Sequence, residues 1–171
     1  MLDRAIRAVE RVTDVAAVLG CLLLLPLILS MTYEVVARYA FRAPTFWAFE
    51  VSYMLMGSIF MLGMAAALKH DQHVRVDFIF NMLPPRVRAG VDILCFLLVL
   101  PCAAWLAYEL FNFAQRAYVS GRSTGRSAWN PVIWPYRAML SVGFAVLTLQ
   151  ILVQMVKSVR VIVTGSAQKG Q

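Results

Sequence analysis

The residues with the most evident chemical potential lie in one short stretch, KHDQHVRVD, from Lys69 to Asp77. It contains both histidines of the chain, His70 and His73, with Asp71 between them. Imidazole and carboxylate groups bind metals, and histidine titrates near neutral pH, so a metal site, a proton relay and a charged helix cap are all chemically open. Metal sites usually draw ligands from more than one element. The sequence favours a charged connecting turn, and we predict no catalytic, cofactor-binding or metal-binding residue.

A second candidate is Glu50, a carboxylate about one turn into an apolar run. Ionisable groups at membrane depth are costly to bury and are often functional. The first turn of a helix also favours negative charge, because the positive end of the helix dipole lies there. Two roles therefore stay open for Glu50: a simple first-turn acid, or a buried ion pair with Arg38, Arg42 or a base of another subunit. A proton relay is less favoured, because no series of carboxylates continues inward.

Two polar stripes interrupt later apolar runs, and both have helical spacing. Gln150 and Gln154 share one face of the last run. The other stripe faces protein or water rather than lipid if its run is a helix, and it comprises Glu109, Asn112, Gln115 and Arg116.

Two other sets of residues indicate no chemistry. Cys21, Cys95 and Cys102 form no C-x-x-C pair, so we interpret them as small packing residues. The stretch GRSTGRS, residues 121–127, lacks the G-K-[ST] ending and the preceding strand of a phosphate-binding loop.

The composition requires a membrane environment for these residues. Of the 171 residues, 61% are hydrophobic and the mean hydropathy is +0.71, an excess that a small soluble fold cannot bury. About 20 apolar residues in a helix cross the hydrocarbon core of a bilayer. We therefore predict an all-α fold with a single membrane domain over residues 1–171. Its four transmembrane helices are expected at about 15–37, 46–68, 88–115 and 136–160.

The first 14 residues predict a short interfacial amphipathic helix, because apolar residues recur at helical spacing with charges between them. The distribution of basic residues predicts that both termini are cytoplasmic. With that orientation the inner side holds three, four and three lysines and arginines, ten in all, and the outer side holds six. Basic residues favour the cytoplasmic side.

Local signals refine the first two spans. Glu34 and Arg38 can form an ion pair at i, i+4. Thr45 follows a proline that ends the first helix, and we expect it to be the N-cap of the second. Trp47 lies where an aromatic belt residue belongs. Gly63 and Ala67 form a small-xxx-small pair that allows another helix to approach closely.

The stretch ARYAFRAPTFWAFEVSYMLMGSIFMLGMAAALKHDQHVRVDFIFNMLPPRVR resembles the small membrane subunit of tripartite ATP-independent periplasmic (TRAP) transporters, of the DctQ/SiaQ type. The final span, PVIWPYRAMLSVGFAVLTLQILVQ, is also similar to the last helix of this family. The family often has two acids after the tryptophan, whereas here Phe49 precedes Glu50. The residues that carry the resemblance are Arg38-Tyr39, Trp47, Glu50, Leu62-Gly63-x-Ala65, His73-Val74-Arg75-Val76-Asp77 and Leu83-Pro84.

The resemblance implies a scaffold subunit of a sodium-driven transporter in the bacterial inner membrane, with no enzymatic activity and no cofactor. A large elevator-type permease subunit would carry the transport path, and a periplasmic binding protein would deliver an organic acid. The candidates for structural or subunit contacts are Arg38, Trp47, Glu50, Gly63, His73, Arg75 and Asp77. Candidates for contacts with the binding protein are Arg116, Arg122 and Arg126.

The alternative is a membrane anchor of a redox enzyme complex. A haem anchor needs histidines within its spans, and neither histidine lies in one of the predicted spans.

Overall fold

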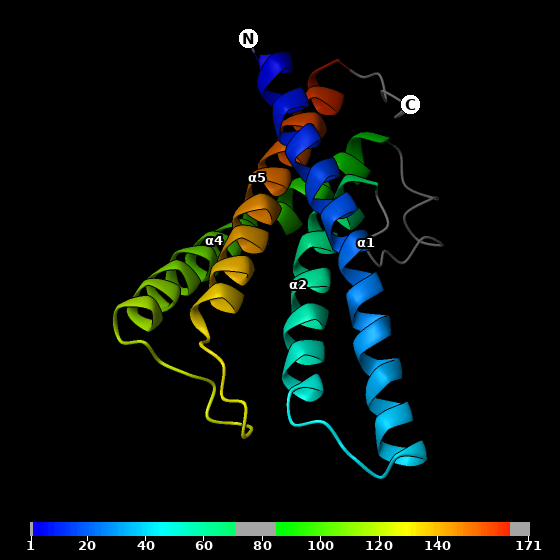
Figure 1. Ribbon diagram of the computed structural model, residues 1–171. Coiled ribbons are helices and arrows are strands. Elements are labelled where there is room, and N and C mark those ends of the chain that lie inside the picture. Colours follow the sequence, from blue (N-terminus) through cyan, green and yellow to red (C-terminus); the bar gives the residue numbers. More distant parts are fainter. Residues whose placement is uncertain (1, 71–84, 165–171) are drawn as a thin grey trace.

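The computed structural model describes residues 2–70 and 85–164, and these residues form four long α-helices (Figure 1). Each of them is long and apolar enough to cross a membrane, which confirms the predicted all-α class with four helices able to span a membrane. Within the described ranges the only extended pairing is one isolated bridge between Ser123 and Val132. The helices are α1 (Leu2–Ala40), α2 (Ala48–Lys69), α4 (Pro85–Val119) and α5 (Trp134–Thr164).

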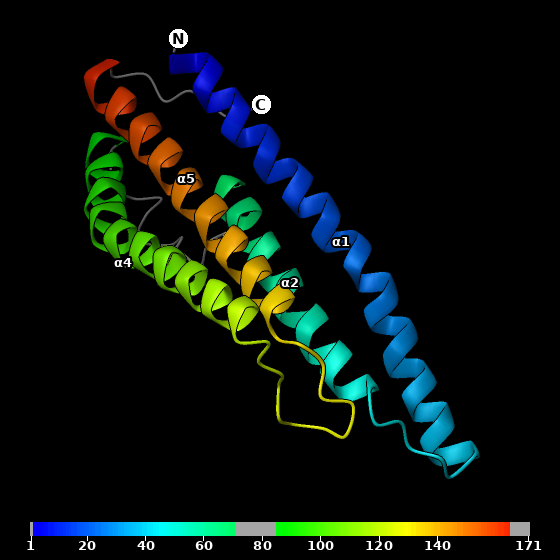
Figure 2. The same ribbon diagram turned by 60° about the vertical axis from the view of Figure 1, so that its left-hand side comes forward.

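The helices pack in the spatial order α1, α2, α5, α4 (Figures 1 and 2). α1 packs against α2, α2 against α5, and α5 against α4, and α1 also contacts α5 over part of its length. We call the end of the bundle that holds the start of α1 and the end of α5 the terminal end. The opposite end, which holds the links 41–47 and 120–133, is the loop end.

The bundle is inside-out by the standards of a soluble protein, because its core is small and its surface is apolar. Leu29 and Leu98 are 68% and 73% exposed, and large apolar side chains lie outward along all four helices. Hydrocarbon solvates such a surface as well as a protein core does. The buried cluster draws on all four helices and consists of Ala16, Leu62, Ala65, Leu68, Ala103, Val146, Leu147 and Ile151.

Glycines set the closest approach between helices. A Cβ placed on Gly143 of α5 would lie 2.6 Å from the Cβ of Met61 on α2 and 3.2 Å from the Met61 carbonyl oxygen. Gly20 of α1 meets Leu62 of α2 at ordinary van der Waals distance, 3.5 Å from its Cβ. By contrast, a Cβ on Gly63 would have no neighbour within 4 Å among the described residues. Gly143, and not Gly63, therefore allows the close approach of α5 to Met61 of α2, and Gly57 of α2 likewise leaves room for the Tyr136 ring, whose hydroxyl oxygen would clash with a Cβ there.

Residues 2–14 are continuous with the first span, since α1 is a single helix of 39 residues. At 1.5 Å per residue it is about 58 Å long, well beyond the thickness of a hydrocarbon core. Its position relative to the membrane interface stays a prediction.

The link between α1 and α2 is organised by Glu34. The predicted ion pair with Arg38 is confirmed, with the Arg38 Nε 2.9 Å from Glu34 Oε1. The prediction that Thr45 caps α2 is wrong, because the N-cap is Trp47 and no side chain caps the helix there. The backbone N–H of Thr45 donates to Glu34 Oε2 at 2.9 Å, and its hydroxyl donates to the same oxygen. A charged carboxylate is a stronger acceptor than water, and Thr45 donates to it instead of accepting from the N–H groups at the start of α2.

Candidate functional site

Glu50 lies in the first turn of α2 at the loop end and is 1% exposed. Its Oε2 accepts a hydrogen bond from the Thr124 hydroxyl at 2.7 Å, across 74 positions of the sequence. The other carboxylate oxygen, Oε1, has no hydrogen-bond partner among the described residues. Arg38 pairs with Glu34 rather than with Glu50. The buried acid therefore ties α2 to the link 120–133 and keeps one acceptor atom open.

The link 120–133 is a folded segment, which explains how Thr124 reaches Glu50. The Thr124 N–H donates to Pro131 O at 3.0 Å, and the Ile133 N–H donates to Arg122 O at 3.1 Å. The Gly125 N–H donates to Asn130 Oδ1 at 2.7 Å. These bonds turn the chain back on itself between α4 and α5.

Aromatic residues support the same end of the bundle. Tyr53 of α2 and Tyr136 of α5 lie with ring centres 5.3 Å apart, and the Arg126 guanidinium lies 4.8 Å from the centre of the Tyr53 ring. Trp47 stacks on Tyr33 of α1 at 5.9 Å. Trp47 and Arg126 thus hold the two links against the helices.

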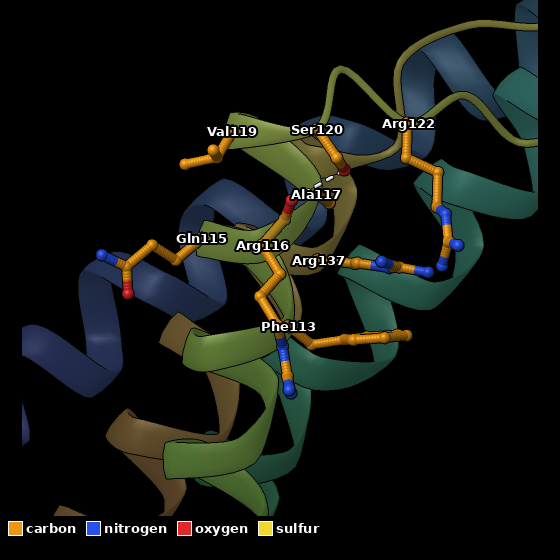
Figure 3. A pocket seen from close by; sticks show the side chains of 8 residues that line it. All are labelled: Phe113, Gln115, Arg116, Ala117, Val119, Ser120, Arg122 and Arg137. Atoms are coloured by element: carbon orange, nitrogen blue, oxygen red, sulfur yellow. Dashed lines mark hydrogen bonds between the residues drawn. The ribbon is translucent and has the colours of Figure 1, made fainter.

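Two other predicted arginines, Arg116 and Arg122, line a hollow where α4 ends (Figure 3). They are joined there by Arg137 from the first turn of α5, which sequence reasoning missed. The Arg137 guanidinium carbon lies 3.4 Å from the centre of the Phe113 ring. Arg116 also contacts Glu109 at 3.5 Å, between two exposed side chains.

At the terminal end, three ion pairs connect α1 with α5 and α2. Asp3 contacts Arg160 at 2.7 Å, Glu10 contacts Lys157 at 2.5 Å, and Asp14 contacts Lys69. We call these pairs the terminal clamp. All three acids of the predicted N-terminal amphipathic helix take part in these pairs. The sequence shows acids near its start and bases after the second and fourth apolar runs, but not which of them pair.

Below the terminal clamp, buried polar side chains join the helices. Gln150 is fully buried and accepts a hydrogen bond from the Thr13 hydroxyl at 3.0 Å. The side-chain amide of Gln154 donates to Leu68 O at 3.0 Å and to Lys69 O at 3.3 Å, so it caps the end of α2. The two glutamines share one face of α5, as predicted, and that face is turned toward α1 and α2.

The terminal clamp gives a first testable prediction. Replacing Glu10 by lysine is expected to lower the free energy of unfolding by up to about 1 kcal/mol, because two positive charges then face each other at a partly exposed site. Adding Lys157→Glu to the same chain is expected to restore most of the loss. Thermal unfolding in detergent, followed by circular dichroism, measures both variants. Losses that simply add in the double variant would contradict a direct pairing.

Gly63 lines a shallow groove between α1 and α2 with a volume of about 270 Å³. The groove is open, which is why a Cβ on Gly63 would have no neighbour within 4 Å among the described residues. Its other lining residues are mostly small or apolar, and include Ala17, Gly20, Leu24, Ala66 and Ala67. The small-residue pair thus lies on the surface, where another helix can reach it.

Of the stretch KHDQHVRVD, residues 69–77, the structure describes only Lys69 and His70. Lys69 belongs to the terminal clamp. His70 is the C-cap of α2, and its N–H donates to Ala66 O at 3.0 Å. His73, Arg75 and Asp77, for which contacts with the third span or with a partner are predicted, lie outside the described residues. In the parts of the chain that the structure describes, no group of three or more metal-binding side chains occurs.

The chain is similar in sequence to known membrane transport proteins. Over 116 residues the chain is 24% identical to the sialic acid TRAP transporter small permease protein SiaQ of Vibrio cholerae, covering 68% of this chain and 64% of that protein. Over 69 residues it is 30% identical to the sialic acid TRAP transporter permease protein SiaT of Haemophilus influenzae, covering 40% of this chain and 11% of that protein.

The family comparison covers more of the chain than either relative does. Residues 27–161 match the family described as tripartite ATP-independent periplasmic transporters, DctQ component. This match takes in the last third of α1, all of α2 and α4, and nearly all of α5. A match of this extent, together with four membrane-crossing helices, shows that the chain belongs to the DctQ component family of TRAP transporters, a family of transporter subunits rather than enzymes, and is a multi-pass protein of the bacterial inner membrane.

Proposed function

We propose that this chain is the small, static scaffold subunit of a sodium-driven TRAP transporter that takes up an organic acid. The observation that carries the proposal is the distribution of polar groups in the described bundle. Ion pairs lie at its two ends, and outward-facing apolar side chains occupy the length between them. A transport path needs polar groups along the middle of the bundle. The middle of this one is suited to packing against lipid and other helices.

Three of the buried hydroxyl groups in the spans support the same conclusion. Ser30, Ser58 and Ser141 each donate to a backbone carbonyl oxygen, at 3.0, 2.8 and 3.2 Å. Hydroxyls engaged in this way satisfy helix backbone and do not line a polar route.

A larger permease is the partner that the relatives support. A segment similar to this chain forms 11% of the SiaT permease protein, so in that relative it is covalently part of a much longer permease. Covalent linkage in one protein favours physical contact between separate chains in another. The names of SiaT and SiaQ indicate sialic acid, itself a carboxylate, and we infer no narrower substrate class than an organic acid.

The orientation that we propose places both termini in the cytoplasm, following the excess of ten basic residues over six. The loop end is then periplasmic. There the folded link 120–133 presents Arg122 and Arg126 to a binding protein, and the last turn of α4 presents Arg116. Glu50, Thr124 and Trp47 are expected to keep that surface in place.

The partner proposal is tested by a pull-down of the tagged chain from its native host in mild detergent, with mass spectrometry of the recovered proteins. A much larger multi-span protein recovered in fixed ratio is the expected result. Recovery of the chain alone, with uptake activity after reconstitution into liposomes, would sink the scaffold proposal. A redox anchor, the alternative function, is not favoured by the family match.

A second prediction locates the contact at the groove between α1 and α2. Replacing Gly63 by leucine fills the groove, so recovery of the large permease in the pull-down is expected to fall several-fold, because close helix approach needs a small residue. Stability of the isolated chain is expected to change little, since a Cβ on Gly63 meets no described atom within 4 Å. Gly90→Leu on α4 is the matched control, because a Cβ on Gly90 likewise meets no atom of the described residues within 4 Å. Equal recovery with both variants would place the interface elsewhere.

A further inference from the structure

The hollow at the end of α4 has a volume of about 680 Å³ (Figure 3). It lies between α4, the link 120–133 and the start of α5. The side chains that line it are Phe113, Gln115, Arg116, Ala117, Val119, Ser120, Arg122 and Arg137. Its lining therefore combines three guanidinium groups with apolar and aromatic surface.

The Phe113 ring orients two of the three arginines. The guanidinium carbon of Arg137 lies 3.4 Å from the ring centre, and that of Arg116 lies 5.9 Å from it. Contact with an aromatic face holds a guanidinium group in place and leaves its N–H groups free to donate at the edge. The Arg137 side chain is half-buried between α4 and α5. The Arg137 guanidinium is thus held in position before any ligand arrives.

The hollow has more positive charge than the described chain neutralises. Figure 3 shows Arg122 coming down from the link toward the Arg137 guanidinium, and the charge of Arg122 acts on Arg137. In the described parts of the chain no carboxylate forms an ion pair with Arg122 or Arg137, whereas Arg116 reaches Glu109 at 3.5 Å. Like charges that face each other repel, and an anion between them removes that repulsion.

The surroundings of the hollow indicate the source of the anion. Val119 is 82% exposed at its rim, and Tyr118 and Trp134 pack edge to face beside it with ring centres 5.3 Å apart. Exposed tyrosine and tryptophan mark headgroup depth in membrane proteins. Outward-facing apolar side chains such as Leu106 continue along α4 from this point toward the middle of the span.

We propose that this hollow is a binding site for the phosphate of an anionic glycerophospholipid. Arg122 and Arg137 would donate to the phosphate oxygens, Arg116 would contribute at the rim, and the acyl chains would lie along the exposed face of α4. Guanidinium groups suit phosphate because they donate in pairs with matching geometry. The site would fix lipid at the surface of the scaffold, independently of what the transporter carries.

The test uses the full-length chain reconstituted in phosphatidylcholine nanodiscs with increasing fractions of phosphatidylglycerol, and native mass spectrometry of the protein released from them. The unmodified chain is expected to retain phosphatidylglycerol in preference to phosphatidylcholine. Arg122→Gln and Arg137→Gln are each expected to weaken that retention about tenfold, because each removes a charge-assisted pair of donors. Arg42→Gln is the matched control, since it removes one exposed charge at the same end but outside the hollow.

Circular dichroism shows whether each variant is folded, and Arg122→Gln keeps the test valid even if loss of the Arg137 contact with Phe113 unfolds the chain. No preference for phosphatidylglycerol in the unmodified chain would overturn the proposal, and so would equal losses in Arg122→Gln and Arg42→Gln. Displacement of the lipid by millimolar inorganic phosphate would assign the site to a free anion. Retention that depends on the three arginines only when a binding protein is present would assign them to that protein.

Discussion

Replacing Gly143 by alanine is expected to lower the free energy of unfolding of the bundle by about 1–3 kcal/mol, because the added methyl group overpacks a tight helix contact. Its Cβ would lie 2.6 Å from the Cβ of Met61 and 3.2 Å from the Met61 carbonyl oxygen. Neither atom is the free end of a flexible side chain, so α2 and α5 must move apart. This contact joins the α1–α2 pair to the α4–α5 pair, and its loss loosens the whole bundle. Thermal unfolding in detergent measures the change.

Gly63→Ala is the matched control for Gly143→Ala. Both glycines lie inside membrane helices. Both substitutions add one methyl group and raise the helix propensity by the same amount. A Cβ on Gly63 meets nothing within 4 Å of the described chain, so the isolated protein is expected to be unchanged or slightly more stable. If Gly143→Ala were as stable as Gly63→Ala, the close packing of α2 on α5 would be wrong.

Replacing Glu50 by alanine is expected to lower the free energy of unfolding by about 1–3 kcal/mol, the range for leaving a hydrogen-bonding group without its partner. The same change is expected to release the link 120–133, because the Thr124 hydroxyl loses the acceptor that holds it at 2.7 Å. Arg122 and Arg126 lie on this link, and both are trypsin cleavage sites. Faster tryptic cleavage after these residues is therefore the specific readout, beside thermal unfolding.

Glu109→Ala is the matched control for Glu50→Ala, since Glu109 lies toward the same end and only forms an exposed pair with Arg116. It is expected to change neither cleavage nor stability measurably. Thr124→Val removes the other partner, so adding it to Glu50→Ala is expected to cost less than the sum of the two single changes. Full additivity in that cycle would show that the hydrogen bond between Glu50 and Thr124 does not hold the link.

These contacts describe a bundle whose ends are tied by polar groups while its length is apolar. Breaking Glu50–Thr124 disturbs one surface, the link at the loop end, whereas breaking Gly143–Met61 disturbs the relation of the two helix pairs. A scaffold needs both features: a fixed internal packing and an organised surface where partners bind. The contrast between local and global effects of the two variants separates these roles experimentally.

Much of the architecture is determined by the sequence alone, because it rests on local physics. Four long apolar runs leave only membrane-crossing helices as a solution, since every backbone polar group must be satisfied within its own segment. The pair Glu34–Arg38 follows from the helical repeat, and so does the common face of Gln150 and Gln154. Helical spacing fixes which residues are neighbours within one helix, and these predictions needed nothing more.

Only the tertiary structure decided which residues meet across the bundle. Thr13 bonds to Gln150, Glu10 pairs with Lys157, and Glu50 accepts from Thr124, over separations of 137, 147 and 74 positions. Periodicity assigns a side chain to a face of its helix but does not say which helix covers that face. For the same reason Gly63, the glycine that the sequence singles out, lies in open space, while Gly143 makes the close contact. The sequence identifies Glu50 as a candidate site because it is an acid within an apolar run. Its partner, the Thr124 hydroxyl, is known only from the structure, because the link 120–133 folds back onto α2.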